Sequence, residues 1–211
     1  MVDTKEKILD SAETLFGEQG YGATSLRHII AHAGVNLASV HYHFGSKEDL
    51  LDAVVRRKLT PINTERMALL AAAEAEVGAD SLPAERLLEA FLRPALMRAG
   101  NDPQFCRLMG RLHGEGLMPG IARKNFQEIA ERFLGGLRRA MPGVSDEEAA
   151  WRIHFMIGAM AQTMKGVPEY PGMAVGKVDD LELLLHRILT FLAAGFRAPA
   201  TESAKAVEVK Q

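Results

Sequence analysis

The chain has 211 residues, a formal net charge of −2, 47% hydrophobic residues and 25% charged residues, which is the balance of a globular protein with a sizeable core. Helix-favouring residues dominate and alternating β-branched runs are scarce, so we expect an all-α fold. No apolar run approaches the roughly 20 residues of a membrane-spanning helix. The charged N-terminal stretch does not resemble a secretory signal. The single cysteine, Cys106, excludes an internal disulfide and favours a cytoplasmic location.

The first predicted element is an amphipathic helix over residues 4–19, which Asp3 or Thr4 caps and Gly20 ends. Its apolar face is formed by Ile8, Ala12, Leu15 and Phe16.

Residues 24–50 follow as two short helices joined by a tight turn. Thr24 is the expected N-cap of the first, whose apolar residues recur at helical spacing, and Gly34 supplies the bend. Asn36 is the expected cap of the second helix. This pattern predicts a helix-turn-helix, whose second helix enters the DNA major groove.

The second short helix of this motif has an inward and an outward side in the pattern. Its inward residues are expected to be Leu37, Val40 and Phe44, which leaves Ser39 and His41 facing out. Charge adds little support for DNA binding, because residues 1–60 carry seven Lys and Arg against eight Asp and Glu.

A longer helix is predicted from residue 47, where Ser46 and Asp49 form a capping pair, and Pro61 is expected to kink or end it. After a break at residues 78–83, helical patterns are separated by Gly, Pro, Asn or Asp. These patterns cover residues 84–99, 103–114, 120–140, 146–166 and 179–196. We therefore predict a helix-turn-helix domain at 1–46, a helical regulatory and dimerisation domain at 47–198, and a disordered tail at 199–211.

The N-terminal segment ILDSAETLFGEQGYGATSLRHIIAHAGVNLASVHYHFGSKEDLLDAV, at about residues 8–55, resembles the TetR family of bacterial transcriptional regulators. The segments GNDPQFCRLMGRL (100–112) and WRIHFMIGAMAQTMKG (151–166) are similar to the fatty-acid-responsive PsrA-type branch. The resemblance implies a homodimer with a four-helix interface from the last two long helices, a palindromic operator, and an acyl effector. No basic arm precedes the first helix, so we expect no minor-groove contacts there.

The candidate DNA contacts fall into two groups. Base contacts are expected from Asn36, Ala38, Ser39 and His41, because amides and hydroxyls bind base edges and a methyl group packs on thymine. The resemblance implies backbone contacts by Thr24, Ser25, Arg27, Tyr42 and Lys47. The alternative is that Asn36 only caps its helix and Tyr42 packs beneath the domain.

The regulatory half is rich in methionine and aromatic residues that suit an adaptable apolar pocket, although an ordinary helix-bundle core explains each of them equally well. The candidate lining residues are Leu87, Phe91, Phe105, Leu108, Met109, Leu112, Phe126, Phe155 and Met156. Three arginines, Arg107, Arg111 and Arg152, are candidates for binding an acidic head group.

The last two predicted helices have faces that suit either dimer contact or cover of the ligand domain. The candidate dimer residues are Trp151, His154, Gly158, Ala161, Leu181, Leu184, Leu185, Ile188 and Leu192.

We expect no cofactor and no metal, because His28 and His32 share a helix face but lack a third ligand. Cys106 and His113 lie two helical turns apart, too far for a nucleophile and its base, so we expect no enzyme activity. The predicted function is a repressor released by a fatty acid or acyl-CoA. The alternative is a helix-turn-helix protein whose C-terminal domain only dimerises and binds no effector.

Overall fold

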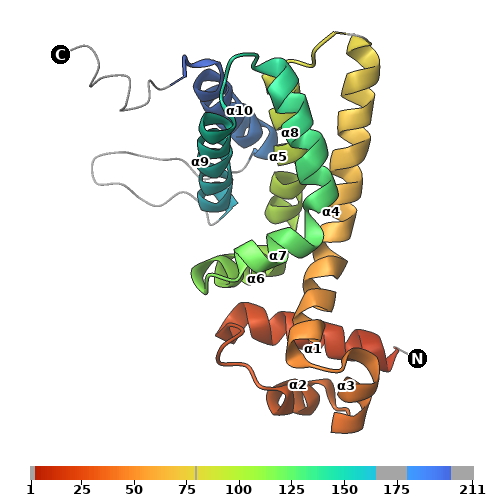
Figure 1. Cartoon of the computed structure of the whole chain (residues 1–211). Coiled ribbons are helices and arrows are strands. Elements are labelled where there is room, and N and C mark those ends of the chain that lie inside the picture. The colour runs from red at the N-terminus through yellow and green to blue at the C-terminus, as the bar shows by residue number, and fades with distance from the viewer. Residues whose placement is uncertain (1–2, 79, 165–179, 201–211) are drawn as a thin grey trace, which may run out of the picture. The chain divides into compact units, whose positions relative to one another are not determined.

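The computed structural model describes residues 3–78, 80–164 and 180–200, and these residues form ten helices and no strand (Figure 1). The all-α prediction is confirmed. The helices are α1 Thr4–Gln19, α2 Leu26–Ala33, α3 Leu37–Phe44, α4 Lys47–Val77, α5 Ala84–Asn101, α6 Pro103–Gly114, α7 Met118–Asn125, α8 Gln127–Ala140, α9 Asp146–Met164 and α10 Leu181–Arg197.

These helices pack into two compact units. Unit 1 contains the described residues up to Met67 together with Pro94–Ala130, and unit 2 contains Ala68–Arg93 and the described residues from Glu131 onward. The domain boundary expected after residue 46 stays a prediction, since unit 1 extends beyond it. Of the predicted disordered tail, residues 201–211 lie outside the described residues.

Helix α1 forms as the sequence predicts. The Asp3 side chain accepts a hydrogen bond from the Lys5 backbone N–H, and Gly20 ends the helix with its N–H bonded to the Phe16 carbonyl. The predicted apolar face is buried, with Ile8 and Ala12 fully inaccessible to solvent. This face provides the apolar surface on which the helix-turn-helix packs.

The turn between α2 and α3 depends on Gly34, whose φ of 65° lies in the left-handed region that glycine adopts without a Cβ clash. The N-cap of α2 is Ser25, whose hydroxyl accepts a hydrogen bond from the His28 N–H, so the cap predicted at Thr24 is wrong by one residue. Asn36 caps α3 as predicted, because its Oδ1 accepts a hydrogen bond from the Ser39 N–H.

Helix α4 begins at the predicted capping pair and continues for 31 residues. The Ser46 hydroxyl accepts a hydrogen bond from the Asp49 N–H and donates one to the Asp49 carboxylate. Pro61 lies inside this helix and neither ends nor divides it. The helix thus contributes its residues up to Met67 to unit 1 and the remainder to unit 2.

Helix α6 packs on α1 within unit 1. Its apolar residues Phe105, Leu108 and Leu112 are buried, and Gly17 of α1 allows close approach to the Leu108 backbone. A chain of ion pairs also ties α1 to α4 and to the start of α6. Its residues are Glu6, Asp10, Glu13, Arg57, Lys58, Arg98 and Asp102.

The single helix expected over residues 120–140 is wrong, because the structure has two helices there. Helix α7 ends at Asn125, and the backbone of Phe126 leaves the helical conformation with φ −122° and ψ 6°. Helix α8 begins at once at Gln127 and continues through two glycines. The break has no Gly or Pro at its position, which are the residues that signal helix ends in a sequence.

None of the helices in the described ranges is long and apolar enough to cross a lipid bilayer.

Candidate DNA-binding interface

Helix α3 presents an outward face of four residues at helical spacing, namely Leu37, Ala38, His41 and Tyr42, all of which are exposed. Tyr42 is 86% exposed, so the alternative in which it packs beneath the domain is wrong. Val40 is fully buried and holds the opposite side of α3 against the rest of unit 1. Leu37 was expected to pack inward but is 44% exposed, because it lies at the first turn beyond the reach of the core.

The polar groups at the start of α3 are partly engaged in the helix cap. The Oδ1 of Asn36 accepts hydrogen bonds from the Ser39 N–H and from the Ser39 hydroxyl, at 2.8 and 3.0 Å. The Asn36 amide NH₂ group has no protein partner within the described part of the chain. Capping and base contact are therefore compatible at this residue, because the amide retains its donors.

His41 is oriented by its own helix end. Its Nδ1 lies 2.9 Å from the Gly45 carbonyl oxygen. A carbonyl only accepts, so this ring nitrogen carries the hydrogen and donates it. The Nε2 atom on the other side of the exposed ring remains available to a base or a phosphate.

The residues expected to bind phosphate near α2 differ in accessibility. Arg27 is exposed and has no ion-pair partner among the described residues, and Ser25 is half-buried with its hydroxyl oxygen at the helix cap. Thr24 is only 1% exposed, and its hydroxyl lies 2.7 Å from the Gly20 carbonyl and 3.2 Å from the Leu15 carbonyl. The Thr24 hydroxyl is therefore engaged inside the domain and is not accessible to a phosphate.

Lys47 at the start of α4 is half-buried against the turn that follows α1. Its ammonium donates a hydrogen bond to the Tyr21 carbonyl at 2.5 Å and lies 4.1 Å from the centre of the Tyr21 ring. Burial lowers the pKa of the Lys47 ammonium, and the carboxylate of Glu115 opposes that effect. Sequence reasoning missed Tyr21 and Glu115, since nothing in a local pattern connects residue 21 with residue 115.

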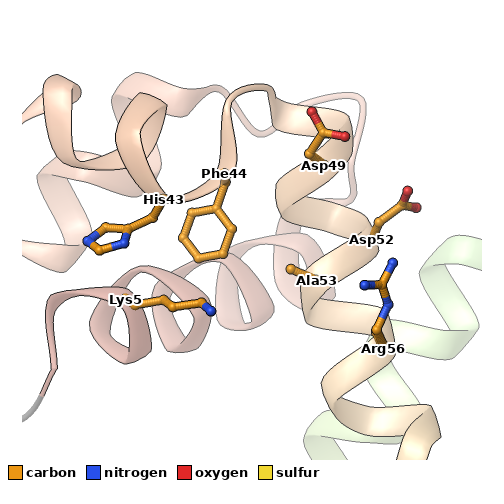
Figure 2. Close-up of a pocket in the computed structure, with 7 residues that line it drawn as sticks. All are labelled: Lys5, His43, Phe44, Asp49, Asp52, Ala53 and Arg56. Atoms are coloured by element: carbon orange, nitrogen blue, oxygen red, sulfur yellow. The ribbon is translucent and has the colours of Figure 1, made fainter.

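A cleft of about 340 Å³ lies between the N-terminal end of α1, the end of α3 and the first turns of α4 (Figure 2). Its lining residues are Lys5, His43, Phe44, Asp49, Asp52, Ala53 and Arg56. Most of them are charged or polar, and Asp52 is already paired with Lys124 at 2.5 Å. This polar lining does not suit the apolar effector predicted for the C-terminal half.

The candidate effector residues are divided between the two units. Five belong to unit 2, namely Leu87, Phe91, Arg152, Phe155 and Met156, and seven belong to unit 1, namely Phe105, Arg107, Leu108, Met109, Arg111, Leu112 and Phe126. In unit 1, the buried side of α6 packs on α1.

Two members of the candidate set are corrected. Phe155 is 61% exposed on α9, so it does not line an internal pocket of unit 2. Arg152 is buried, and its guanidinium donates to Glu148 and to the carbonyls of Phe196, Ala198 and Pro199. Its donors are therefore committed to the end of α10, which removes it as a ligand head-group binder.

The candidate dimer residues also separate by burial. On α9, Trp151, His154 and Gly158 are exposed and Ala161 is half-buried, so these four residues stay candidates for the dimer face. On α10, Leu185, Ile188 and Leu192 are buried within the protomer, so their assignment to the interface is wrong. Leu181 and Leu184 are half-buried, and the large apolar side chains that α10 exposes are Leu183 and Phe191.

The described residues contain no group of three or more His, Cys, Asp or Glu residues placed to hold a metal ion. Helices α2 and α3, joined by the Gly34 turn and with the outward face of α3 exposed, are the helix-turn-helix of a DNA-binding protein. Residues 8–54 match the family described as "Bacterial regulatory proteins, tetR family", and residues 89–195 match "Tetracyclin repressor-like, C-terminal domain". The chain belongs to the TetR family, and it is a DNA-binding transcriptional regulator rather than an enzyme.

Individual relatives support the same assignment. The chain is 28% identical over 182 residues to the HTH-type transcriptional regulator BetI of Rhizobium meliloti (strain 1021), an alignment that covers 83% of this chain and 86% of BetI. Among solved structures, the fatty acid degradation regulator FadR from Bacillus halodurans has a TM-score of 0.64 at 18% identity, covering 94% of this chain and 99% of FadR. The ketosteroid regulator KstR2 of Mycobacterium tuberculosis has a TM-score of 0.59 at 18% identity, covering 92% and 95%. These two structures share the fold with this chain.

Proposed function

We propose that the protein is a homodimeric repressor that binds a palindromic operator in the bacterial cytoplasm and is released by a hydrophobic acyl effector. The observation that carries the DNA-binding part is the outward face of α3, where Ala38, His41 and Tyr42 are exposed while Val40 anchors the helix. Two such helices in a dimer enter successive major grooves about 34 Å apart.

We assign the base contacts to Asn36, Ala38, Ser39 and His41. The backbone contacts are assigned to Ser25, Arg27, Tyr42 and Lys47. Arg27 and Lys47 are the cationic members of this set, so they account for most of the salt dependence of binding. An ammonium has three donors, and the Tyr21 carbonyl uses one, so Lys47 retains two for a phosphate.

The DNA assignment is tested by measuring operator affinity by fluorescence anisotropy over a range of salt concentrations. The operator is first selected from a random DNA pool. Arg27→Ala is expected to weaken binding to all sequences and to make the plot of log K against log salt shallower by about 0.9 for each phosphate that the arginine neutralises. The matched control is Arg123→Ala, an exposed arginine on α7 outside the proposed surface. An unchanged slope in Arg27→Ala would remove Arg27 from the backbone contacts.

The acyl effector is supported by the methionine-rich helices, by the PsrA-type resemblance of residues 100–112 and 151–166, and by the fatty acid degradation that FadR is named as regulating. A ligand that binds only the folded protein stabilises it by RT ln(1 + [L]/Kd), about 2.7 kcal/mol at a hundred times Kd.

Oleoyl-CoA is therefore expected to raise the melting temperature and to release the operator, and neutral drug-like compounds are expected to do neither. Stabilisation by the neutral compounds alone contradicts the acyl assignment. No release by any compound favours the alternative in which the C-terminal domain only dimerises.

A further inference from the structure

The carboxylate of Glu115 binds two consecutive backbone N–H groups in the turn that follows α1. Glu115 is the C-cap residue of α6, and its own N–H bonds to the Arg111 carbonyl. One carboxylate oxygen accepts from the Tyr21 N–H at 3.0 Å and the other from the Gly22 N–H at 2.9 Å. Both oxygens are thus used in charge-assisted hydrogen bonds to a segment more than 90 residues away in the sequence.

The turn is shaped to admit this carboxylate. Gly20 has φ 89°, and a Cβ atom at this position would lie 2.1 Å from the nearer oxygen of Glu115. The Thr24 hydroxyl lies 2.7 Å from the Gly20 carbonyl, and the Tyr21 ring packs on Phe16 with the ring centres 5.5 Å apart. Tyr21 is therefore held on its amide side by Glu115 and on its ring side by the core of unit 1.

Tyr21 in turn holds the ammonium of Lys47. The Tyr21 carbonyl accepts a hydrogen bond from the ammonium, and the ring lies beneath it. A lysine side chain has four rotatable bonds, and ordering it on DNA costs entropy that a pre-positioned ammonium has already lost. The position of the Tyr21 carbonyl thus sets where the two remaining N–H donors of Lys47 point.

We propose that Glu115 is a positioning residue for DNA binding, which acts through the turn at Tyr21 and Gly22 to place the Lys47 ammonium for a backbone phosphate. The proposal rests on the phosphate contact assigned to Lys47 under the proposed function. Through this turn, the C-terminal end of α6 contributes to operator affinity without a DNA contact of its own.

A double-mutant cycle on the full-length protein tests this role, with Glu115→Gln, Lys47→Ala and the double variant. Glutamine keeps one acceptor for the Tyr21 N–H but turns an NH₂ group toward the Gly22 N–H, so the second hydrogen bond is lost. Gln104→Ala is the matched control, because it removes another hydrogen bond between α6 and α1, from the Gln104 amide to the Thr14 hydroxyl at 2.8 Å, without touching the turn.

Glu115→Gln is expected to weaken operator binding about fivefold to tenfold, in the range of coupling between residues of one network. It should also make the salt dependence shallower, toward that of Lys47→Ala. In the Lys47→Ala background Glu115→Gln should have no further effect, and Gln104→Ala should bind as the parent protein does. A change in the salt slope indicates an effect on the Lys47 ammonium and distinguishes it from a general loss of stability. Thermal melts of each variant measure that stability independently.

Three outcomes overturn the proposal, and they are distinguishable. If Glu115→Gln weakens binding equally with and without Lys47, Glu115 acts on the fold and not on the ammonium. If Lys47→Ala weakens binding and Glu115→Gln does not, the phosphate contact stands and the positioning role fails. If Lys47→Ala itself changes neither affinity nor slope, both the assigned contact and the role built on it fail.

Discussion

The guanidinium of Arg152 lies at the C-terminal end of α10, inside unit 2. Nη1 donates to the Phe196 carbonyl at 2.7 Å, Nη2 donates to the Ala198 carbonyl at 2.9 Å, and Nε donates to the Glu148 carboxylate at 3.0 Å. The last carbonyls of a helix lack partners within the helix, and a cation there also opposes the negative end of its dipole. Arg152 supplies both effects from a site that is only 6% exposed.

Replacing Arg152 by lysine is therefore expected to destabilise the protein by about 3 kcal/mol, because a single ammonium cannot reproduce the planar fork of donors and leaves buried carbonyls unbonded. Urea unfolding monitored by circular dichroism measures the change. The control is Arg139→Lys, whose ion pair with Glu74 is exposed on the arginine side and should change stability by less than about 0.5 kcal/mol. Equal effects of the two substitutions would show that the bonds to α10 contribute no special stability.

Single residues also show what a sequence pattern reveals and what it does not. Helical spacing predicted the burial of Ile8 and the cap at Asn36, because both depend on neighbours within one or two turns. The roles of Arg152 and Glu115 depend on carbonyls and N–H groups 44 to 94 residues away. A polar residue on a predicted helix appears solvated until its distant partner is known, so these two roles were not predictable.

At the scale of whole helices, the predicted bounds of α1 and α6 are confirmed to the residue, because Gly20, Asp102 and Pro103 mark their ends. Internal prolines were less informative: Pro61 and Pro94 both lie inside helices. Both prolines fall in long helices that packing can stabilise, and tertiary packing overrides the local cost of a missing backbone hydrogen bond. Capping residues and glycines thus predict where these helices end, whereas an internal proline does not predict that a helix stops.

Asp102 joins three helices and gives the ion network of unit 1 a defined pH response. It caps α6 through the Phe105 N–H at 3.0 Å and pairs with Lys58 and Arg98 at 3.1 and 2.8 Å. Burial alone raises the pKa of Asp102, but the hydrogen bond from Phe105 and the two cations outweigh it, so the pKa lies below its ordinary value.

A carboxyl group with a lowered pKa stabilises the folded state above its unfolded pKa of about 3.9, and this stabilisation is lost as the pH falls through the folded value. Asp102→Asn is expected to cost about 1 kcal/mol at pH 7, because asparagine still caps the helix but loses both ion pairs. The difference from the parent protein should shrink as urea titrations are repeated at pH values below about 4.

The control for this pH series is Asp146→Asn, an exposed carboxylate paired with Arg138 on the surface. It should have a much smaller effect at every pH, because water screens the pair. A stability difference for Asp102→Asn that stays constant down to acidic pH would mean that the charge of Asp102 does not cause it.

At the scale of the whole molecule, α9 and α10 pack on each other and expose large apolar side chains on their outer faces. Trp151 and Phe155 of α9 are 52% and 61% exposed, and Phe191 of α10 is 72% exposed. Large apolar side chains exposed on neighbouring helices are typical of a surface that another protein covers. For a homodimer, the same face of a second copy buries it in an isologous contact.

Phe191→Asp is therefore expected to convert the proposed dimer into a monomer at micromolar concentration, because a symmetric contact through this residue would bury an unpaired carboxylate twice. Sedimentation velocity measures the change in mass. Operator affinity should fall by at least about a hundredfold, because two half-sites are then bound by separate molecules and the advantage of their linkage disappears.

Phe191→Leu is the control: it keeps an apolar side chain at an exposed site and should remain dimeric with near-parental affinity. Since neither substitution touches the core of the protomer, both variants should melt as folded proteins, and a dimer that persists in Phe191→Asp would place the interface on another surface.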